Sequence, residues 1–153
     1  MAAKPTGPKH LAATVRLVIN AASAKPAPPV GPALGQAGLN IMAFCKEFNA
    51  KTAGYKDGVP LPVKLRVFSD KSYEWDLKTP NTTWLIKQAA GLARCSDRPG
   101  HEEPAAISLK HVYEIARLKQ RDLPHLELEA LCKSVMGVCK SVGVRVVARP
   151  EDA

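Results

Sequence analysis

The chain has 153 residues and is basic, with Lys plus Arg outnumbering Asp plus Glu by 22 to 14. Apolar residues make up 46% of it, which allows a packed core and excludes a wholly disordered chain. The net charge of +8 favours polyanionic partners such as nucleic acid. No segment approaches the roughly 20 consecutive apolar residues of a membrane-spanning helix, so we expect no membrane partner.

The first half of the chain carries the patterns of β-strands and of one amphipathic helix. Apolar and polar residues alternate in three segments, 11–20, 63–67 and 73–77. This alternation indicates half-buried strands, and the short polar link before the last one predicts a hairpin. Asn40 is a suitable N-cap for a helix that ends near Gly54. We therefore predict a small N-terminal α/β domain with a three-stranded sheet and a helix.

The second half carries the pattern of helices. Apolar residues recur at helical spacing in three segments, 85–90, 112–116 and 128–142. Ser108 is suited to cap the second helix and Gly143 to end the third, after which 144–147 form a short extended tail. We expect a compact all-α three-helix domain, which gives an α+β protein as a whole. Such a domain suits nucleic-acid binding, although a plain helical bundle gives the same pattern.

The best domain boundary is at Pro80. A strand must stop before this proline, and Asn81 can cap the helix that follows. We therefore place the two domains at 1–79 and 80–153.

Charge is divided unevenly between the two halves. Residues 1–80 hold 11 basic and 5 acidic side chains, a net charge of +6, and residues 81–153 hold 11 and 9, a net charge of +2. A basic surface in the second half must therefore come from how its charges are arranged.

The residues of an enzyme site are missing from the sequence. It has no P-loop, no G-x-S-x-G and no H-E-x-x-H, and its four His are scattered. The four Cys form no C-x-x-C pair, which indicates reduced thiols rather than a zinc site. We expect no catalytic residues, no metal, no cofactor and no small-molecule substrate.

The last predicted helix has an unusual polar face. Opposite its apolar stripe lie Lys133, Met136, Gly137, Lys140 and Ser141. A glycine inside a helix costs about 1 kcal/mol relative to alanine, and close approach of another group commonly compensates. That group is either the sugar–phosphate backbone of RNA, whose shallow minor groove suits a smooth helix face, or a second helix crossing at Gly137. Spacing alone leaves both readings open.

The segment K-P-A-P-P-V-G-P-A-L-G-Q, residues 25–36, is the most distinctive in the chain. Its prolines fix φ and remove hydrogen-bond donors, so we expect a rigid surface loop. Residues 23–32, with four prolines from Pro26 to Pro32, form a turn-rich block through which we expect regular structure not to run. An ordinary loop and a proline-rich partner ligand are the alternatives. The direct lead into G-Q-x-G-x-N-I and an amphipathic helix is not typical of such a ligand.

Residues 26–52, P-A-P-P-V-G-P-A-L-G-Q-A-G-L-N-I-M-A-F-C-K-E-F-N-A-K-T, resemble the hallmark of the ribosomal protein L11 family. The similarity continues through D-K-S-Y-E, K-T-P and I-K-Q-A-A-G. It resumes at H-V-Y-E-I-A-R-L-K and at K-S-V-M-G-V-C-K-S-V-G, residues 133–143. It covers nearly the whole chain and keeps order and spacing.

The resemblance implies a structural constituent of the large ribosomal subunit. The C-terminal domain would bind a compact, folded segment of large-subunit ribosomal RNA in the GTPase-associated centre. The N-terminal domain would form the stalk base with neighbouring stalk proteins and engage translational GTPases such as elongation factor G. In bacteria, thiopeptide antibiotics bind beside its proline-rich helix.

The resemblance also implies roles for particular residues of this chain. The expected RNA-binding positions are Lys87, Arg94, Arg98, Lys133, Gly137, Val138, Lys140 and Ser141. The expected factor- and antibiotic-facing positions are Pro28, Pro29, Gly31, Pro32 and Gln36. Lys46 matches a methylation target of bacterial members.

Two features separate this chain from bacterial members. Val138 stands where those members often have threonine, so a hydroxyl that could bond RNA is absent. Residues 111–120 and the sequence S-V-G-V-R-V-V, 141–147, resemble mitochondrial members more closely. We therefore expect a mitochondrial ribosome in the matrix, with the bacterial cytoplasm and the plastid as alternatives.

A DNA-binding regulator is the competing function. It would place the third helix in a major groove, where Arg, Asn or Gln normally contact base edges. The face of this helix presents Lys, Gly and Ser instead, which disfavours that function.

Overall fold

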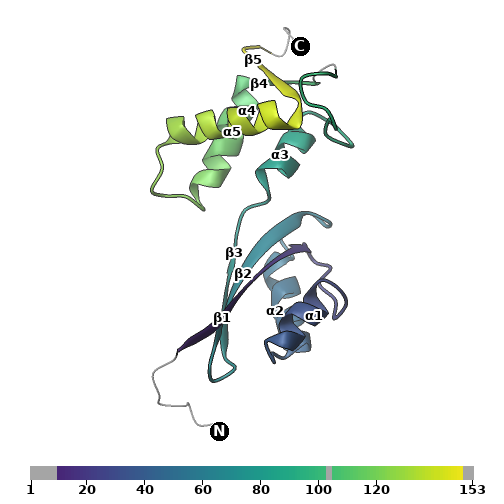
Figure 1. Cartoon of the computed structure of the whole chain (residues 1–153), viewed down its shortest axis with the longest axis vertical. Helices are drawn as coiled ribbons and strands as arrows, with labels where there is room; N and C mark the ends of the chain where they lie inside the picture. Colours follow the sequence, from purple (N-terminus) through teal and green to yellow (C-terminus); the bar gives the residue numbers. More distant parts are fainter. Residues whose placement is uncertain (1–9, 103–104, 150–153) are drawn as a thin grey trace. The chain divides into compact units, whose positions relative to one another are not determined.

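The computed structural model describes residues 10–102 and 105–149 (Figure 1). The chain forms two compact units, of which the first ends at Lys78 and the second begins at Thr79. No helix in the described ranges is long and apolar enough to cross a membrane.

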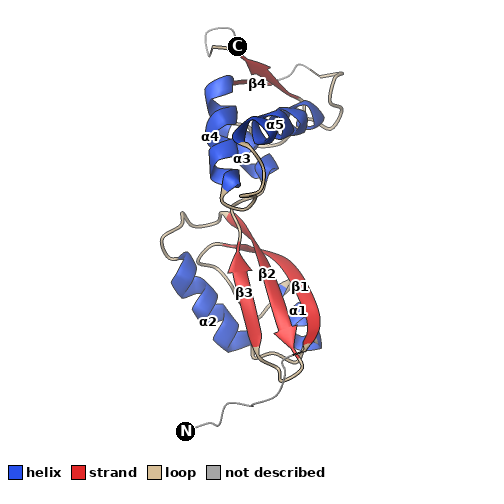
Figure 2. Cartoon of the chain, turned by 90° about the vertical axis from the view of Figure 1, so that its left-hand side faces the viewer, coloured by secondary structure: helices blue, strands red, loops and turns tan. Residues whose placement is uncertain are grey.

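The first unit is built on an antiparallel sheet of three strands in the order β1-β2-β3 (Figure 2). The strands are β1 (Leu11–Asn20), β2 (Pro60–Phe68) and β3 (Tyr73–Leu77). Alternate residues of β2 are buried, so one face of the sheet forms the core and the other is open. The predicted three-stranded sheet and its hairpin are confirmed.

Two helices, α1 (Val30–Gln36) and α2 (Ile41–Thr52), cover the apolar face of this sheet (Figure 1). Asn40 caps α2 as predicted, because its side-chain oxygen accepts a hydrogen bond from the backbone N–H of Ala43 at 3.2 Å. Phe44 and Phe48 of α2 are fully buried, and their ring centroids lie 5.7 and 5.9 Å from that of Trp75 on β3. Aromatic packing therefore joins helix and sheet.

The proline-rich segment contains a helix, so the expectation that regular structure cannot run through it is wrong. Pro29 is the N-cap of α1, and Pro32 is its third residue. The first four N–H groups of any helix lack a partner within the helix, so a proline at this position removes no hydrogen bond. The buried side chains of Val30 and Leu34 then fix α1 against the rest of the unit.

The second unit contains three helices and a small parallel sheet. Its elements are α3 (Thr82–Ala89), β4 (Ala105–Ser108), α4 (Leu109–Gln120), α5 (Leu128–Val142) and β5 (Val144–Val147). Its core includes Ile86, Val112, Leu131 and Val135, so every helix contributes to it. Ser108 caps α4 and Gly143 ends α5, as predicted.

The predicted all-α architecture of the second unit is wrong. β4 and β5 pair in parallel, from Ala105 opposite Val144 to Ser108 opposite Val147. The sequence predicted the extended tail but not a partner for it, because strands of four residues carry little periodicity of their own. The pairing satisfies backbone groups that the tail would otherwise leave to solvent.

Thr79, the first residue of the second unit, is held by the end of α4. Its backbone N–H and its hydroxyl both donate hydrogen bonds to the carboxylate of Asp122. Lys119 reaches the carbonyl of Thr79 at 3.4 Å and the Asp122 carboxylate at 3.8 Å. Both charged side chains are largely buried, so this network fixes the start of the unit more firmly than an exposed ion pair could.

We predict that Thr52→Val lowers the free energy of unfolding of the first unit by about 1–2 kcal/mol. The buried Thr52 hydroxyl donates to the carbonyl of Phe48 at 2.8 Å and accepts from the N–H of Ala22 at 3.1 Å, and valine leaves that N–H without its partner. Urea titration followed by Trp75 fluorescence in a Trp84→Phe background measures the effect. Exposed Thr14→Val is the control, and an equal loss in both variants would contradict the prediction.

Candidate nucleic-acid interface

The outer face of α5 is smooth and basic. Gly137 lies four residues after Lys133, and Lys140 and Ser141 lie three and four residues after Gly137, so the four share one face of the helix, and all are exposed. Lys133 forms an ion pair with Glu129 at 2.7 Å, but both side chains are more than two-thirds exposed. This pair therefore contributes little to stability and leaves the lysine accessible to another anion.

Gly137 lies on this face, and none of the described residues packs against it. A Cβ built on Gly137 meets no other atom within 4 Å, apart from the helix's own neighbouring backbone. A tight crossing with another helix would place such atoms there, so that reading is wrong for this chain. Packing among the described residues therefore does not offset the cost of a glycine in this helix.

The end of α5 is fixed by Gly143. This residue has φ of 79°, in the left-handed region, and its N–H reaches back to the carbonyls of Cys139 and Lys140. A Cβ at this position would lie only 2.6 Å from the Cβ of Ser96. The close contact places the loop that carries Ser96 beside the basic end of α5.

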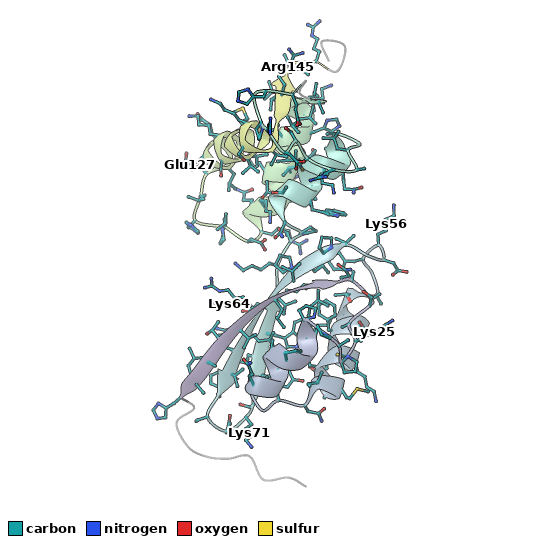
Figure 3. The ribbon with its side chains drawn as sticks, turned by 45° about the vertical axis from the view of Figure 1, so that its right-hand side comes forward. Lys25, Lys56, Lys64, Lys71, Glu127 and Arg145 are labelled. Carbon is teal, nitrogen blue, oxygen red and sulfur yellow. The ribbon has the colours of Figure 1, made fainter. Side chains whose placement is uncertain are left out.

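A hollow of about 370 Å³ lies at this end of α5. It is lined by Gly100, Met136, Lys140, Gly143, Val144, Arg145 and Val146. Its walls are mainly apolar, and its two cations come from different elements, α5 and β5. Figure 3 labels Arg145 on β5. Sequence reasoning missed Arg145, although its place in the strand alternation beside buried Val144 could have indicated an outward-facing cation.

The other expected RNA-binding residues lie in varied surroundings. Arg94 is exposed and paired with Asp97 at 2.9 Å, and Arg98 is exposed in the same loop. Lys87 is half-buried in the last turn of α3 and does not line the hollow. Val138 is partly buried against the core, and its carbonyl accepts the hydroxyl proton of Ser141 at 2.8 Å.

The proline-rich segment forms a second candidate surface, on the first unit. Pro28, Pro29, Pro32 and Gln36 are all exposed. A Cβ on Gly31 would lie 3.2 Å from the carbonyl oxygen of Pro26, so the turn before α1 closes tightly over a residue without a side chain. The expected modification site, Lys46, is exposed on α2.

Asn49 and Thr52 of α2 anchor the chain that leads into this surface. The Asn49 amide accepts from the N–H of Ala24 at 3.0 Å and donates to its carbonyl at 3.2 Å. The Thr52 hydroxyl accepts a hydrogen bond from the N–H of Ala22, a residue whose φ is 54°. The sequence does not predict these hydrogen bonds, because an Asn and a Thr near the end of a helix do not by themselves indicate a distant backbone partner.

Metal-binding groups and buried thiols were the other possible features of a site. Within them, no three His, Cys, Asp or Glu side chains are grouped so that they could hold a metal ion. Burial raises the pKa of the Cys45 and Cys139 thiols, which keeps both in the neutral form. These two residues act as small apolar core side chains.

Comparison with known proteins accounts for both units. Residues 15–73 match the family model of the ribosomal protein L11 N-terminal domain, and residues 78–146 match that of the ribosomal protein L11 RNA-binding domain. The chain belongs to the ribosomal protein L11 family. It is 47% identical over 135 residues to "Large ribosomal subunit protein uL11m" of Schizosaccharomyces pombe, covering 87% of this chain and 94% of that protein.

Membership of the L11 family makes this protein a structural constituent of the large ribosomal subunit with an RNA-binding domain. The match to that domain includes all of α5, the Ser96 loop and most of β5. The smooth basic face and the hollow at its end therefore belong to the part of the chain that the family uses to bind RNA.

We predict that Gly143→Ala lowers the free energy of unfolding of the second unit by about 2–4 kcal/mol. Alanine would be strained at this positive φ, and its methyl group would collide with Ser96. Urea titration followed by Trp84 fluorescence in a Trp75→Phe background measures the loss.

Gly91→Ala is the matched control, because Gly91 also has a positive φ but its Cβ would meet nothing within 4 Å. It should show only the cost of the backbone strain. Equal losses in the two variants would show that the contact with Ser96 is unimportant.

Proposed function

We propose that the α5 face and the adjoining hollow bind a compact, folded segment of large-subunit ribosomal RNA at the GTPase-associated centre. The observation that carries this proposal is exposed Gly137 between Lys133 and Lys140, with no residue of 10–102 or 105–149 packed on it. A helix without a side chain at its centre can lie flat on the wide minor groove of RNA, while the flanking lysines meet phosphates.

Arg145 extends this surface beyond the helix. It lines the hollow together with Lys140, so two cations from separate elements face one apolar recess. Two positive charges on different elements suit an RNA whose tertiary fold brings two backbone strands together, better than they suit one regular duplex. Arg94 and Arg98 lie in the neighbouring loop, where Arg94 can exchange its exposed Asp97 partner for a phosphate.

The domain division at Pro80 separates two roles. Residues 80–153 hold the RNA, and residues 1–79 present the exposed prolines and Gln36 to translational GTPases such as elongation factor G, beside the neighbouring stalk proteins. The short, firmly anchored α1 supports this role, because a stiff surface loses little conformational entropy when a factor docks. Lys46 is open to methylation.

The ribosome concerned is the mitochondrial one, in the matrix. The sequences of residues 111–120 and 141–147 favour this assignment. The 47% identity to the fission yeast protein, whose name carries the mitochondrial suffix m, supports it over most of both chains.

We expect Gly137→Ala to weaken binding to a transcript of the GTPase-associated RNA segment by about tenfold while raising the stability of the second unit by about 0.5–1 kcal/mol. The added methyl favours the helix, but it stands where the RNA backbone would approach. Filter binding and urea titration of the same preparation measure the two effects.

Gly35→Ala adds the same methyl to an exposed helical glycine of the first unit and should leave RNA affinity unchanged. Unchanged affinity in Gly137→Ala would remove this face from the interface. Equal binding to duplex DNA would favour the DNA-binding function instead.

For the first unit, we predict that Gly31→Ala lowers the rate of GTP hydrolysis by elongation factor G severalfold on ribosomes that carry the variant, with RNA affinity retained. The methyl group would press on the carbonyl of Pro26 and shift the prolines that begin α1. Gly35→Ala again serves as the control, since its Cβ would meet nothing within 4 Å. Equal rates for both variants would argue against a factor-facing role.

A further inference from the structure

The open face of the sheet in the first unit carries a cluster of cations. Strand register places Arg16 of β1 opposite Lys64 of β2, and Val18 opposite Pro62. The backbone N–H of Lys78 bonds to the carbonyl of Pro62 at 3.0 Å, so Lys78 follows in the same row. Lys64 lies between buried Val63 and Leu65, and Figure 3 shows it on the side of the sheet away from α1 and α2.

The carboxylates on this face do not neutralise the cluster. Strand register places Asp76 opposite Lys64 and Glu74 opposite Arg66, but both carboxylates approach the guanidinium of Arg66, Glu74 at 3.7 Å and Asp76 at 3.1 Å. Within the described part of the chain, no carboxylate lies within 4.0 Å of the side-chain nitrogens of Arg16, Lys64 or Lys78. Three positive charges on neighbouring strands are therefore available to an outside partner.

The cations surround an apolar recess. A hollow of about 330 Å³ is lined by Arg16, Leu17, Val18, Pro62, Val63, Lys64 and Lys78. Val18 is 47% exposed and offers apolar surface beside the cations. Pro62 adds apolar surface and has no N–H to donate.

We propose that this face docks an acidic protein segment that places an apolar side chain over Val18 and Pro62. The three cations would meet its carboxylates, and the recess would take the apolar anchor. RNA fits the surface less well. No aromatic side chain lines the recess for base stacking, and no Asn or Gln is present to read a base. The surface is separate from the RNA-binding face of α5 and does not depend on it.

The first test uses a fluorescent peptide of glutamates around a central leucine pair, titrated into the full chain at low salt. Arg16→Glu combined with Lys64→Glu should weaken binding about tenfold, because two attractions become repulsions. Lys56→Glu is the matched control: it makes the same charge change in the loop after α2, away from the sheet face (Figure 3). Equal loss in the control would overturn the proposal.

The second test locates the partner in assembled ribosomes. A photoreactive benzoylphenylalanine in place of Val18 should cross-link to a protein segment with net negative charge. The yield should fall in the Arg16→Glu, Lys64→Glu background and persist with Lys56→Glu. Cross-linking to ribosomal RNA, to a basic segment or to nothing would overturn the proposal. Binding of the isolated GTPase-associated RNA transcript should be unchanged in all these variants, so failure here is distinguishable from failure of the RNA-binding proposal.

Discussion

The arrangement of the second unit depends on the left-handed turn at Gly143. The turn ends α5 and sends the chain directly into β5, whose pairing with β4 then follows. Because Gly143 has no side chain, Ser96 and its loop can lie close against the helix end. Helix, loop and strand meet at one point, and the hollow lined by Lys140 and Arg145 lies there. The left-handed backbone conformation of Gly143 thus determines the geometry of the candidate RNA site.

The first unit depends on a different device, the anchoring of an irregular segment by polar side chains. Asn49 and Thr52 hold the backbone at Ala24 and Ala22, so the chain arrives at the first turn of α1 in a fixed position. Helix propensity contributes little to a helix of seven residues that contains two glycines and a proline. The stability of α1 comes from the burial of Val30 and Leu34. These buried side chains also hold in place the exposed prolines, whose φ angles are fixed by their rings.

The sequence was sufficient where a local pattern determines the structure. Alternation identified the three strands, Asn40 and Ser108 were recognisable caps, and Gly143 was a recognisable stop. Prediction failed where the deciding factor was position within an element or a partner distant in sequence. The run of prolines predicts a break in regular structure, but Pro32 lies in the first turn of α1, where a proline removes no hydrogen bond. The β4–β5 pairing joins segments more than thirty residues apart, and neither is long enough to indicate the other.

The candidate sites likewise contain residues that a local pattern predicts and residues that only the fold brings together. The α5 face could be predicted, because helical spacing brings Lys133, Gly137 and Lys140 together. Arg145 could not, since it joins Lys140 only after the turn at Gly143. The basic sheet face also escaped prediction: Arg16, Lys64 and Lys78 lie far apart in sequence and meet through strand register. Part of the excess positive charge of the first half is thus concentrated on one surface. The second half is nearly balanced in charge, and its candidate surface has only a few cations, which lie beside the exposed backbone of Gly137. The two candidate surfaces therefore differ in how their positive charge is arranged, which suits the different partners that we propose for them.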